Sequence, residues 1–178
     1  AKRRHWAAIG RRARARPNVV FLLADQLRHA SVGYAGDSLA HTPNIDQLAA
    51  EGVRFDQAVS NTPVCAAYRA SLFTGKYASS TGMAINELRI HPAQRCLGHV
   101  VSEAGYETGY IGKWHLWGKI APNLADRHFV PRGPYRLGWD GFWDAYDFHH
   151  EYYKAFSFRE SREKLDTPGF EPDHQTDL

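Results

Sequence analysis

The chain has 178 residues, of which 43% are hydrophobic and 13% aromatic. This composition fits one ordered globular domain with a sizeable core and excludes an intrinsically disordered protein. The longest apolar run, Val19 to Ala24, has the length of a strand and falls well short of the roughly 20 residues that cross a bilayer, so we expect no membrane span. Two cysteines are too few for a disulfide framework.

The formal net charge of +3 is set by one end of the chain. Seven of the 22 Lys and Arg residues precede Pro17, and the rest of the chain has 15 basic against 19 acidic residues, a net charge of −4. We expect residues 1–16 to be a basic, solvated leader without fixed structure, although such an arm could also contact RNA or a membrane surface. The apolar stretch Trp6 to Ile9 is too short for a signal peptide, so none is predicted and the cytoplasm is the default compartment.

Two strands and a helix are predicted in the first third of the chain. The continuous apolar run Val19 to Ala24 predicts a strand buried on both faces, as in a parallel sheet. Thr42 as N-cap and Pro43 at the first helical position predict a helix that Gly52 ends. The partly alternating stretch Val53 to Val59 is a candidate second strand. The apolar residues of the helix recur at helical spacing, at Ile45, Leu48 and Ala49.

The later part of the chain predicts two more helices and one strand. One helix begins at Cys65, and another contains Leu97, Val100, Val101 and Ala104 and stops at Gly105. A strand from Tyr106 to Ile111 follows. The segment Pro131 to Trp143 is rich in Pro, Gly and aromatic residues and predicts an ordered loop, and we expect the polar residues 157–178 to be frayed.

This alternation of strands and helices predicts an α/β sandwich with a largely parallel sheet. In such sheets, functional side chains gather beyond the carboxyl ends of the strands. Asp25 follows the first predicted strand and Lys113 follows the last one, so both are candidate site residues.

The most informative stretch has a cysteine at the predicted start of a helix and an arginine one helical turn later, at Cys65 and Arg69. The free N–H groups and positive dipole end of a helix N-terminus favour an anion there. From the residues alone, Cys65 could be a buried inert thiol, a disulfide partner of Cys96, or a thiolate stabilised by the helix.

Four collinear blocks resemble the sulfatase family. The blocks are Pro17 to Arg28, Thr42 to Ala49, Cys65 to Gly75 and Gly112 to Leu116. The resemblance implies an alkaline-phosphatase-like α/β/α sandwich, of which this chain is the N-terminal portion. Residues 17–156 are then the N-terminal part of a sulfatase catalytic domain, and residues 157–178 are a polar tail running into the remainder. The implied activity is that of a sulfuric ester hydrolase, which releases an alcohol and inorganic sulfate from a small-molecule or carbohydrate sulfate ester.

The resemblance also implies roles for four catalytic residues. Cys65 is converted to formylglycine by a maturation enzyme and becomes the nucleophile, although Ala67 stands where the family more often has proline. Arg69 hydrogen-bonds the nucleophile or the metal-bound carboxylates, Lys113 binds a sulfate oxygen, and His115 helps to move the proton of the nucleophile. The alternatives are a surface arginine, a solvated lysine and a half-buried histidine.

A divalent cation, expected to be Ca²⁺, completes the implied site. Its ligands would be the carboxylate of Asp25, the amide oxygen of Gln26 and an oxygen on modified Cys65. The family more often has two adjacent aspartates, so Gln26 removes one negative charge and could instead be a hydrogen-bond partner of the ligands. Asp25 alone could also be a turn carboxylate at the end of a strand.

The stretch around His149 and His150 combines histidines with Tyr146, Tyr152 and Tyr153. Such an aromatic cluster is more often packing than a site. The resemblance implies a second reading, in which this stretch lies near the substrate mouth.

Two other functions fit the same residues. A site for a tetrahedral anion could hydrolyse phosphodiesters, phosphomonoesters or phosphonate esters. The chain could also be a truncated, inactive anion-binding fragment, since family members are generally much longer and supply further metal ligands later in their sequence. We therefore expect little or no sulfatase activity from these 178 residues alone, and no nucleic-acid partner.

Overall fold

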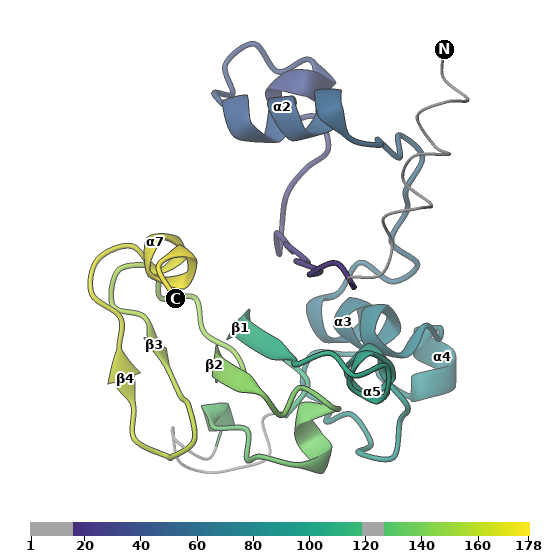
Figure 1. Cartoon of the computed structure of the whole chain (residues 1–178), viewed down its shortest axis with the longest axis vertical. Helices are drawn as coiled ribbons and strands as arrows, with labels where there is room; N and C mark the ends of the chain where they lie inside the picture. Colours follow the sequence, from purple (N-terminus) through teal and green to yellow (C-terminus); the bar gives the residue numbers. More distant parts are fainter. Residues whose placement is uncertain (1–15, 119–126) are drawn as a thin grey trace. The chain divides into compact units, whose positions relative to one another are not determined.

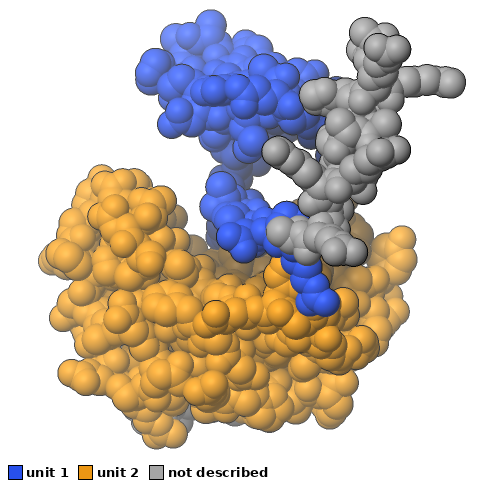
Figure 2. All heavy atoms as spheres, viewed as in Figure 1, with its two compact units in different colours: residues 1–56 blue, residues 57–178 orange. Residues whose placement is uncertain are grey.

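The computed structural model describes residues 16–118 and 127–178. The chain divides into two compact units, residues 1–56 and residues 57–178, which Figure 2 colours separately. The predicted basic leader, apart from Arg16, lies outside the described residues.

The described part of the first unit contains η1 (Gly33–Ala35) and α2 (Pro43–Glu51) (Figure 1). The predicted helix is confirmed, with Thr42 as N-cap and Gly52 as C-cap. The Thr42 hydroxyl does not cap the helix; it accepts the Gly33 N–H at 2.9 Å and donates to Asp46 Oδ1 at 3.0 Å. A Cβ on Gly33 would lie 2.4 Å from Asp46 Oδ2, so a larger residue would displace the carboxylate that bonds Tyr34 and Thr42.

The two strands expected in this region are absent from the described residues. Val19 to Ala24 and Val53 to Val59 are not in strands, and Leu22 and Val59 expose 85% and 89% of their surface. Ile45 and Leu48 on α2 are also exposed, at 43% and 66%. An apolar run favours burial, but a strand forms only where a neighbouring strand accepts its hydrogen bonds. No described segment of the first unit supplies such a neighbour.

The described part of the second unit contains helices and short strands (Figure 1). In chain order these are α3 (Cys65–Thr74), α4 (Ala78–Thr81), α5 (Leu97–Glu103), β1 (Gly109–Lys113), η2 (Pro134–Arg136), β2 (Phe142–Tyr146), β3 (Phe156–Ser157), β4 (Leu165–Asp166) and α7 (Glu171–Thr176). No helix among the described residues is long and apolar enough to cross a membrane.

The helices predicted at Cys65 and Leu97 are confirmed as α3 and α5. The strand predicted over Tyr106 to Ile111 forms later, as β1. The Tyr106 N–H donates to Val101 O at 3.0 Å, so this residue still belongs to the turn that closes α5. As a result, Lys113 is the last residue of the strand rather than a residue that follows it.

The predicted parallel sheet is confirmed by β1 and β2, which pair in parallel from Gly109 opposite Phe142 to Lys113 opposite Tyr146. Strand β2 begins inside the segment expected to be a loop. Four of its five residues are buried, so the segment gains its strand structure from packing that the Pro- and Gly-rich composition does not indicate.

The expectation that residues 157–178 are frayed is wrong. Strands β3 and β4 pair antiparallel, and Phe158 exchanges two backbone hydrogen bonds with Ala145 of β2, at 2.8 and 3.0 Å. Glu171, the first residue of α7, is buried and its carboxylate accepts a hydrogen bond from Tyr146. The segment is ordered by these backbone pairings and by the hydrogen bond of the buried Glu171 to Tyr146.

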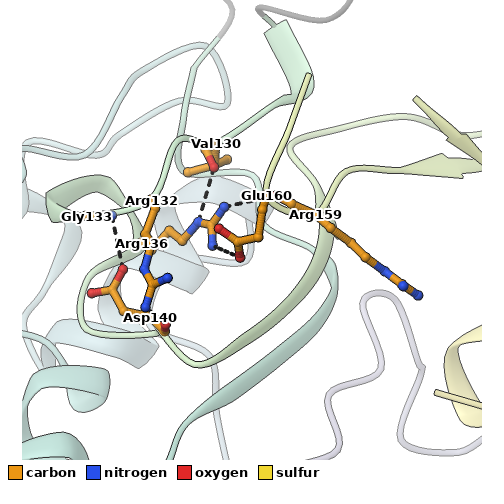
Figure 3. Close-up of polar contacts among 7 residues, drawn as sticks. All are labelled: Val130, Arg132, Gly133, Arg136, Asp140, Arg159 and Glu160. Carbon is orange, nitrogen blue, oxygen red and sulfur yellow. Dashed lines mark hydrogen bonds and ion pairs between the residues drawn. The ribbon is translucent and has the colours of Figure 1, made fainter. Parts of the chain in front are cut away.

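A fully buried arginine joins the loop after residue 126 to the segment after β3 (Figure 3). The Arg136 guanidinium donates to Val130 O at 3.2 Å, Arg159 O at 3.0 Å and Glu160 Oε1 at 2.9 Å. It also lies 4.6 Å from the centroid of the Trp143 ring. The planar Arg136 guanidinium thus donates hydrogen bonds to two main-chain carbonyls and one carboxylate from a single buried position.

Aromatic rings form the centre of the second unit. The completely buried Trp114 lies with its ring centroid 4.9 Å from Tyr110, 5.2 Å from Trp143 and 5.3 Å from Phe73. Because Trp114 stands between Lys113 and His115, this packing anchors the segment that contains both predicted site residues.

Candidate active site

Cys65 is the first residue of α3, directly after Val64 in extended conformation. Its thiol is half-buried and free, and the thiol of the buried Cys96 is also free, so the structure contains no disulfide between them. The Ala66 N–H donates to Asn86 Oδ1 at 3.0 Å, so a side chain 20 residues later caps the helix. Cys65 therefore lies at the positive end of a capped helix, accessible in part to solvent.

Arg69 lies one turn after Cys65 and is buried, with 4% of its surface exposed. This burial excludes the surface-residue alternative. Its Nη1 donates to Lys113 O at 2.6 Å and to Tyr110 Oη at 3.3 Å, and the Tyr110 hydroxyl donates to the same carbonyl at 2.5 Å. The arginine thus ties the helix of Cys65 to the end of β1.

Lys113 and His115 contact the same aromatic ring. The Lys113 Nζ lies 5.0 Å from the centroid of Phe148, and the His115 ring stacks on Phe148 with centroids 4.4 Å apart. His115 is buried, with 1% of its surface exposed, and has a φ of 54°. This left-handed conformation is uncommon for a residue other than glycine and marks a constrained position.

Asp147 lies directly after β2, beside His115. It is buried, with 1% of its surface exposed, and its Oδ1 accepts the Trp117 N–H at 2.8 Å. Burial raises the pKa of the Asp147 carboxyl to about 6, and backbone hydrogen bonds from Trp117, Leu116 and Gly118 together with the charge of Arg89 oppose this rise.

Asp25 and Gln26, the predicted metal ligands, belong to the first unit and lie in an exposed bend. The strand expected to end at Asp25 is absent, so their position at a strand end is not observed. Among residues 16–118 and 127–178, no group of three or more His, Cys, Asp or Glu side chains is arranged to hold a metal ion.

The aromatic cluster after β2 is largely packing. His149 stacks on Tyr146 with centroids 3.6 Å apart, and its Nε2 lies 3.0 Å from Phe156 O. Burial lowers the pKa of His149, which favours its neutral form. His150 differs, because it is exposed and its ring meets Phe148 edge-on at 4.6 Å.

Three residues of this region are missed by sequence reasoning: Asn86, Asp147 and Phe148. Asn86 lies in a loop with no motif that links it to Cys65. Asp147 and Phe148 follow a strand that is not predicted. A confident assignment of β2 would have placed both beside Lys113, since parallel neighbours end at the same sheet edge.

The chain belongs to the sulfatase family. The sulfatase family model matches residues 17–171, which is most of the chain. The match extends beyond residue 156 into the segment that sequence analysis treats as a tail.

Several curated relatives are similar over much of the chain. The ulvan-active sulfatase of Formosa agariphila is 44% identical over 139 residues, covering 78% of this chain and 26% of that protein. Human arylsulfatase D is 34% identical over 139 residues, covering 72% of this chain and 23% of that protein. The chain therefore spans about a quarter of the length of these relatives.

Solved structures confirm the fold class. The yidJ sulfatase of Bacteroides fragilis has a TM-score of 0.77 at 28% identity, over 89% of this chain and 38% of that one. A protein in complex with its substrate D-glucosamine-2-N,6-O-disulfate has a TM-score of 0.72 at 27% identity, over 92% of this chain and 30% of that one. The expected alkaline-phosphatase-like α/β fold, in its N-terminal portion, is thus shown.

Proposed function

We propose that the protein hydrolyses a sulfate ester to an alcohol and inorganic sulfate, with formylglycine made from Cys65 as its nucleophile. The observation that carries the proposal is the hydrogen bond from Arg69 to the Lys113 carbonyl. Through it, the helix that begins at Cys65 and the strand that leads to His115 share one buried contact. A half-buried cysteine at a helix N-terminus thus belongs to the same packed unit as a lysine and a histidine.

The chemistry of the modified residue suits this position. Hydrated formylglycine supplies two hydroxyl groups on one carbon, one to attack sulfur and one to lose its proton so that sulfate leaves. The α3 N-terminus favours the negative charge of the sulfate group. We assign to Lys113 the binding of a sulfate oxygen, to His115 the proton at the hydroxyl group, and to Arg69 a hydrogen bond to that group through its planar fork.

For the divalent cation, expected to be Ca²⁺, we propose the Asp25 carboxylate, the Gln26 amide oxygen and an oxygen on modified Cys65 as ligands. Carboxylate and amide oxygens are the donors that Ca²⁺ takes in proteins, which supports this choice. Isothermal titration calorimetry with Ca²⁺ tests this ligand set, because it measures binding and needs no enzymatic turnover. Asp25→Ala should abolish the binding, and Asp56→Ala, a substitution of another exposed carboxylate in the same unit, should leave it intact.

For the substrate, we propose a sulfated carbohydrate. Support comes from the relatives, which include an ulvan-active sulfatase and an N-acetylglucosamine-6-O-sulfatase of Bacteroides thetaiotaomicron. The latter is 35% identical over 101 residues, covering 57% of this chain and 18% of that protein.

Peptide mapping of the chain tests the nucleophile directly. After co-expression with a formylglycine-generating maturation enzyme, the peptide with Cys65 should be lighter by about 18 Da, the difference between a thiol and an aldehyde side chain. Cys96 is the internal control and should keep its mass, because it is buried elsewhere in the same unit. If Cys65 stays unmodified both in the parent chain and in the Ala67→Pro variant, the proposal is contradicted.

Turnover tests the reaction. Because the chain spans 26% of the ulvan-active sulfatase, residues 17–171 are grafted in place of the matching segment of that enzyme. The graft should hydrolyse a sulfate ester and lose this activity with Cys65→Ala. Faster hydrolysis of the phosphate ester of the same alcohol would instead assign a phosphoesterase, and binding of sulfate without turnover would assign an anion-binding protein.

A further inference from the structure

We propose that Asp147 and Phe148 are positioning residues for Lys113 and His115: the Asp147 carboxylate holds the loop after His115, and the Phe148 ring supports both side chains. The inference rests on the proposed function of Lys113 and His115. Neither Asp147 nor Phe148 is predicted from the sequence to act at the site. The buried Asp147 and the half-buried Phe148 each contact this segment.

The main chains of the two segments run together beyond the ends of their strands. The Trp114 N–H donates to Tyr146 O at 2.7 Å, and the His115 N–H donates to Asp147 O at 2.8 Å. Backbone hydrogen bonds thus link the two segments past the ends of β1 and β2, as far as His115 and Asp147. This places Asp147 beside the histidine by backbone geometry, before any side chain is considered.

The side chain of Asp147 then holds the backbone that follows His115. Its carboxylate accepts the Trp117 N–H at 2.8 Å and also the backbone N–H groups of Leu116 and Gly118. His115 has a φ of 54°, a conformation that costs a residue with a side chain about 1 kcal/mol or more. The Asp147 carboxylate thus helps the chain to keep this turn, chiefly through its hydrogen bond from Trp117.

The Phe148 ring contacts both side chains. The His115 ring stacks on it with an interplanar angle of 28° and centroids 4.4 Å apart. The ammonium of Lys113 lies 5.0 Å from the same centroid, within the range of a cation–π interaction. A lysine and a histidine on one rigid ring have fewer accessible rotamers than two side chains in solvent.

Asp147 and Phe148 are themselves held in place by His128. The Asp147 N–H donates to His128 O at 3.2 Å, and the Phe148 N–H donates to His128 Nδ1 at 3.3 Å. A buried carboxylate normally requires strong compensation, and here the compensation comes from backbone N–H groups of the segment that carries His115. The group therefore acts on the geometry of the loop rather than on a bound molecule.

Nuclear magnetic resonance of the whole chain tests the geometry. Asp147→Ala should speed amide hydrogen exchange at Trp117 by about tenfold or more, because the N–H loses its acceptor, and Ile111 in β1 should be unchanged. Phe148→Leu should shift the His115 ring resonances, and Phe148→Tyr, which keeps the ring, should restore them. Asp144→Asn is the matched control, because this equally buried carboxylate in β2 bonds Arg159 instead of the loop.

Turnover by the grafted enzyme then tests the consequence. Asp147→Ala and Phe148→Leu should lower kcat by about tenfold or more with little change in KM, whereas Phe148→Tyr and Asp144→Asn should keep kcat near that of the parent. Unchanged exchange at Trp117 together with unchanged His115 resonances would overturn the inference. If Lys113→Ala leaves turnover intact, the proposed function fails. The amide exchange and the His115 ring resonances still decide whether Asp147 and Phe148 order His115.

Discussion

The Arg69 side chain donates a 2.6 Å hydrogen bond to the main-chain carbonyl of Lys113, 44 residues later in the chain. The two residues come from the two blocks of the sequence that carry the proposed chemistry. Their contact is through a backbone atom, so it fixes the position of the end of β1 and leaves the Lys113 ammonium to interact elsewhere.

We predict that Arg69→Ala lowers the free energy of unfolding by roughly 3 kcal/mol, because it removes two buried hydrogen bonds from a charged donor. Urea denaturation of the chain measures this change. Arg95→Ala is the matched control: Arg95 forms an exposed ion pair with Glu103 at 2.7 Å, and its loss should cost less than about 1 kcal/mol. Equal losses for the two arginine variants would contradict the structural role of Arg69.

The two cysteines should differ in reactivity. Burial raises the pKa of the Cys96 thiol to about 11, and the charge of Lys76 only partly opposes this effect. In the unconverted chain at about pH 8, iodoacetamide should therefore label the half-buried Cys65 and leave Cys96 unlabelled until urea unfolds the protein. Mass spectrometry of the two peptides checks this order, and faster labelling at Cys96 would refute it.

The Arg136 cluster should be a major source of stability for the second unit. Arg136→Ala leaves the Val130 and Arg159 carbonyls without their donor and removes a fully buried guanidinium, so it should cost about 3–5 kcal/mol in the free energy of unfolding. Glu160→Gln should cost less than about 1 kcal/mol, because the Glu160 side chain is 54% exposed and its ion pair is screened by solvent. Thermal or urea unfolding of both variants separates the contributions, and a Glu160→Gln loss as large as that of Arg136→Ala would show that the ion pair dominates.

Asp147 should make stability depend on pH. Its pKa is raised to about 6 in the folded chain from an ordinary value of 3.8, so the folded state binds its proton more tightly than the unfolded state does. This stabilising contribution is complete below pH 3.8 and is lost as pH rises through about 6, by up to about 3 kcal/mol. The groups that act on the carboxyl are Arg89 and the backbone N–H groups of Trp117, Leu116 and Gly118.

Urea unfolding from about pH 4 to pH 7 measures this contribution. The Asp147→Asn side chain cannot ionise, so the variant should lack the loss of stability with rising pH that this carboxyl causes. The difference in free energy of unfolding between variant and parent should therefore change with pH. A difference that stays constant across this range would show that Asp147 does not titrate there.

The sequence by itself determined the local elements and the family. Thr42-Pro43 and Gly52 delimit α2, Cys65 begins α3, and the blocks that resemble sulfatases lie within the matched residues 17–171. These signals are local, since caps, helix-start prolines and motif spacing act within a few residues. The four predicted catalytic residues come from the same motifs, and their roles stay predictions.

Only the tertiary structure decided which segments pair and which side chains are buried. The apolar run at Val19 to Ala24 has no described strand partner, whereas β2 forms in a segment whose composition predicts a loop. Strand formation depends on hydrogen bonds to distant residues, which composition does not specify. For the same reason, the contact of Arg69 with Lys113 and the support of His115 by Asp147 and Phe148 could be found only after the chain was folded.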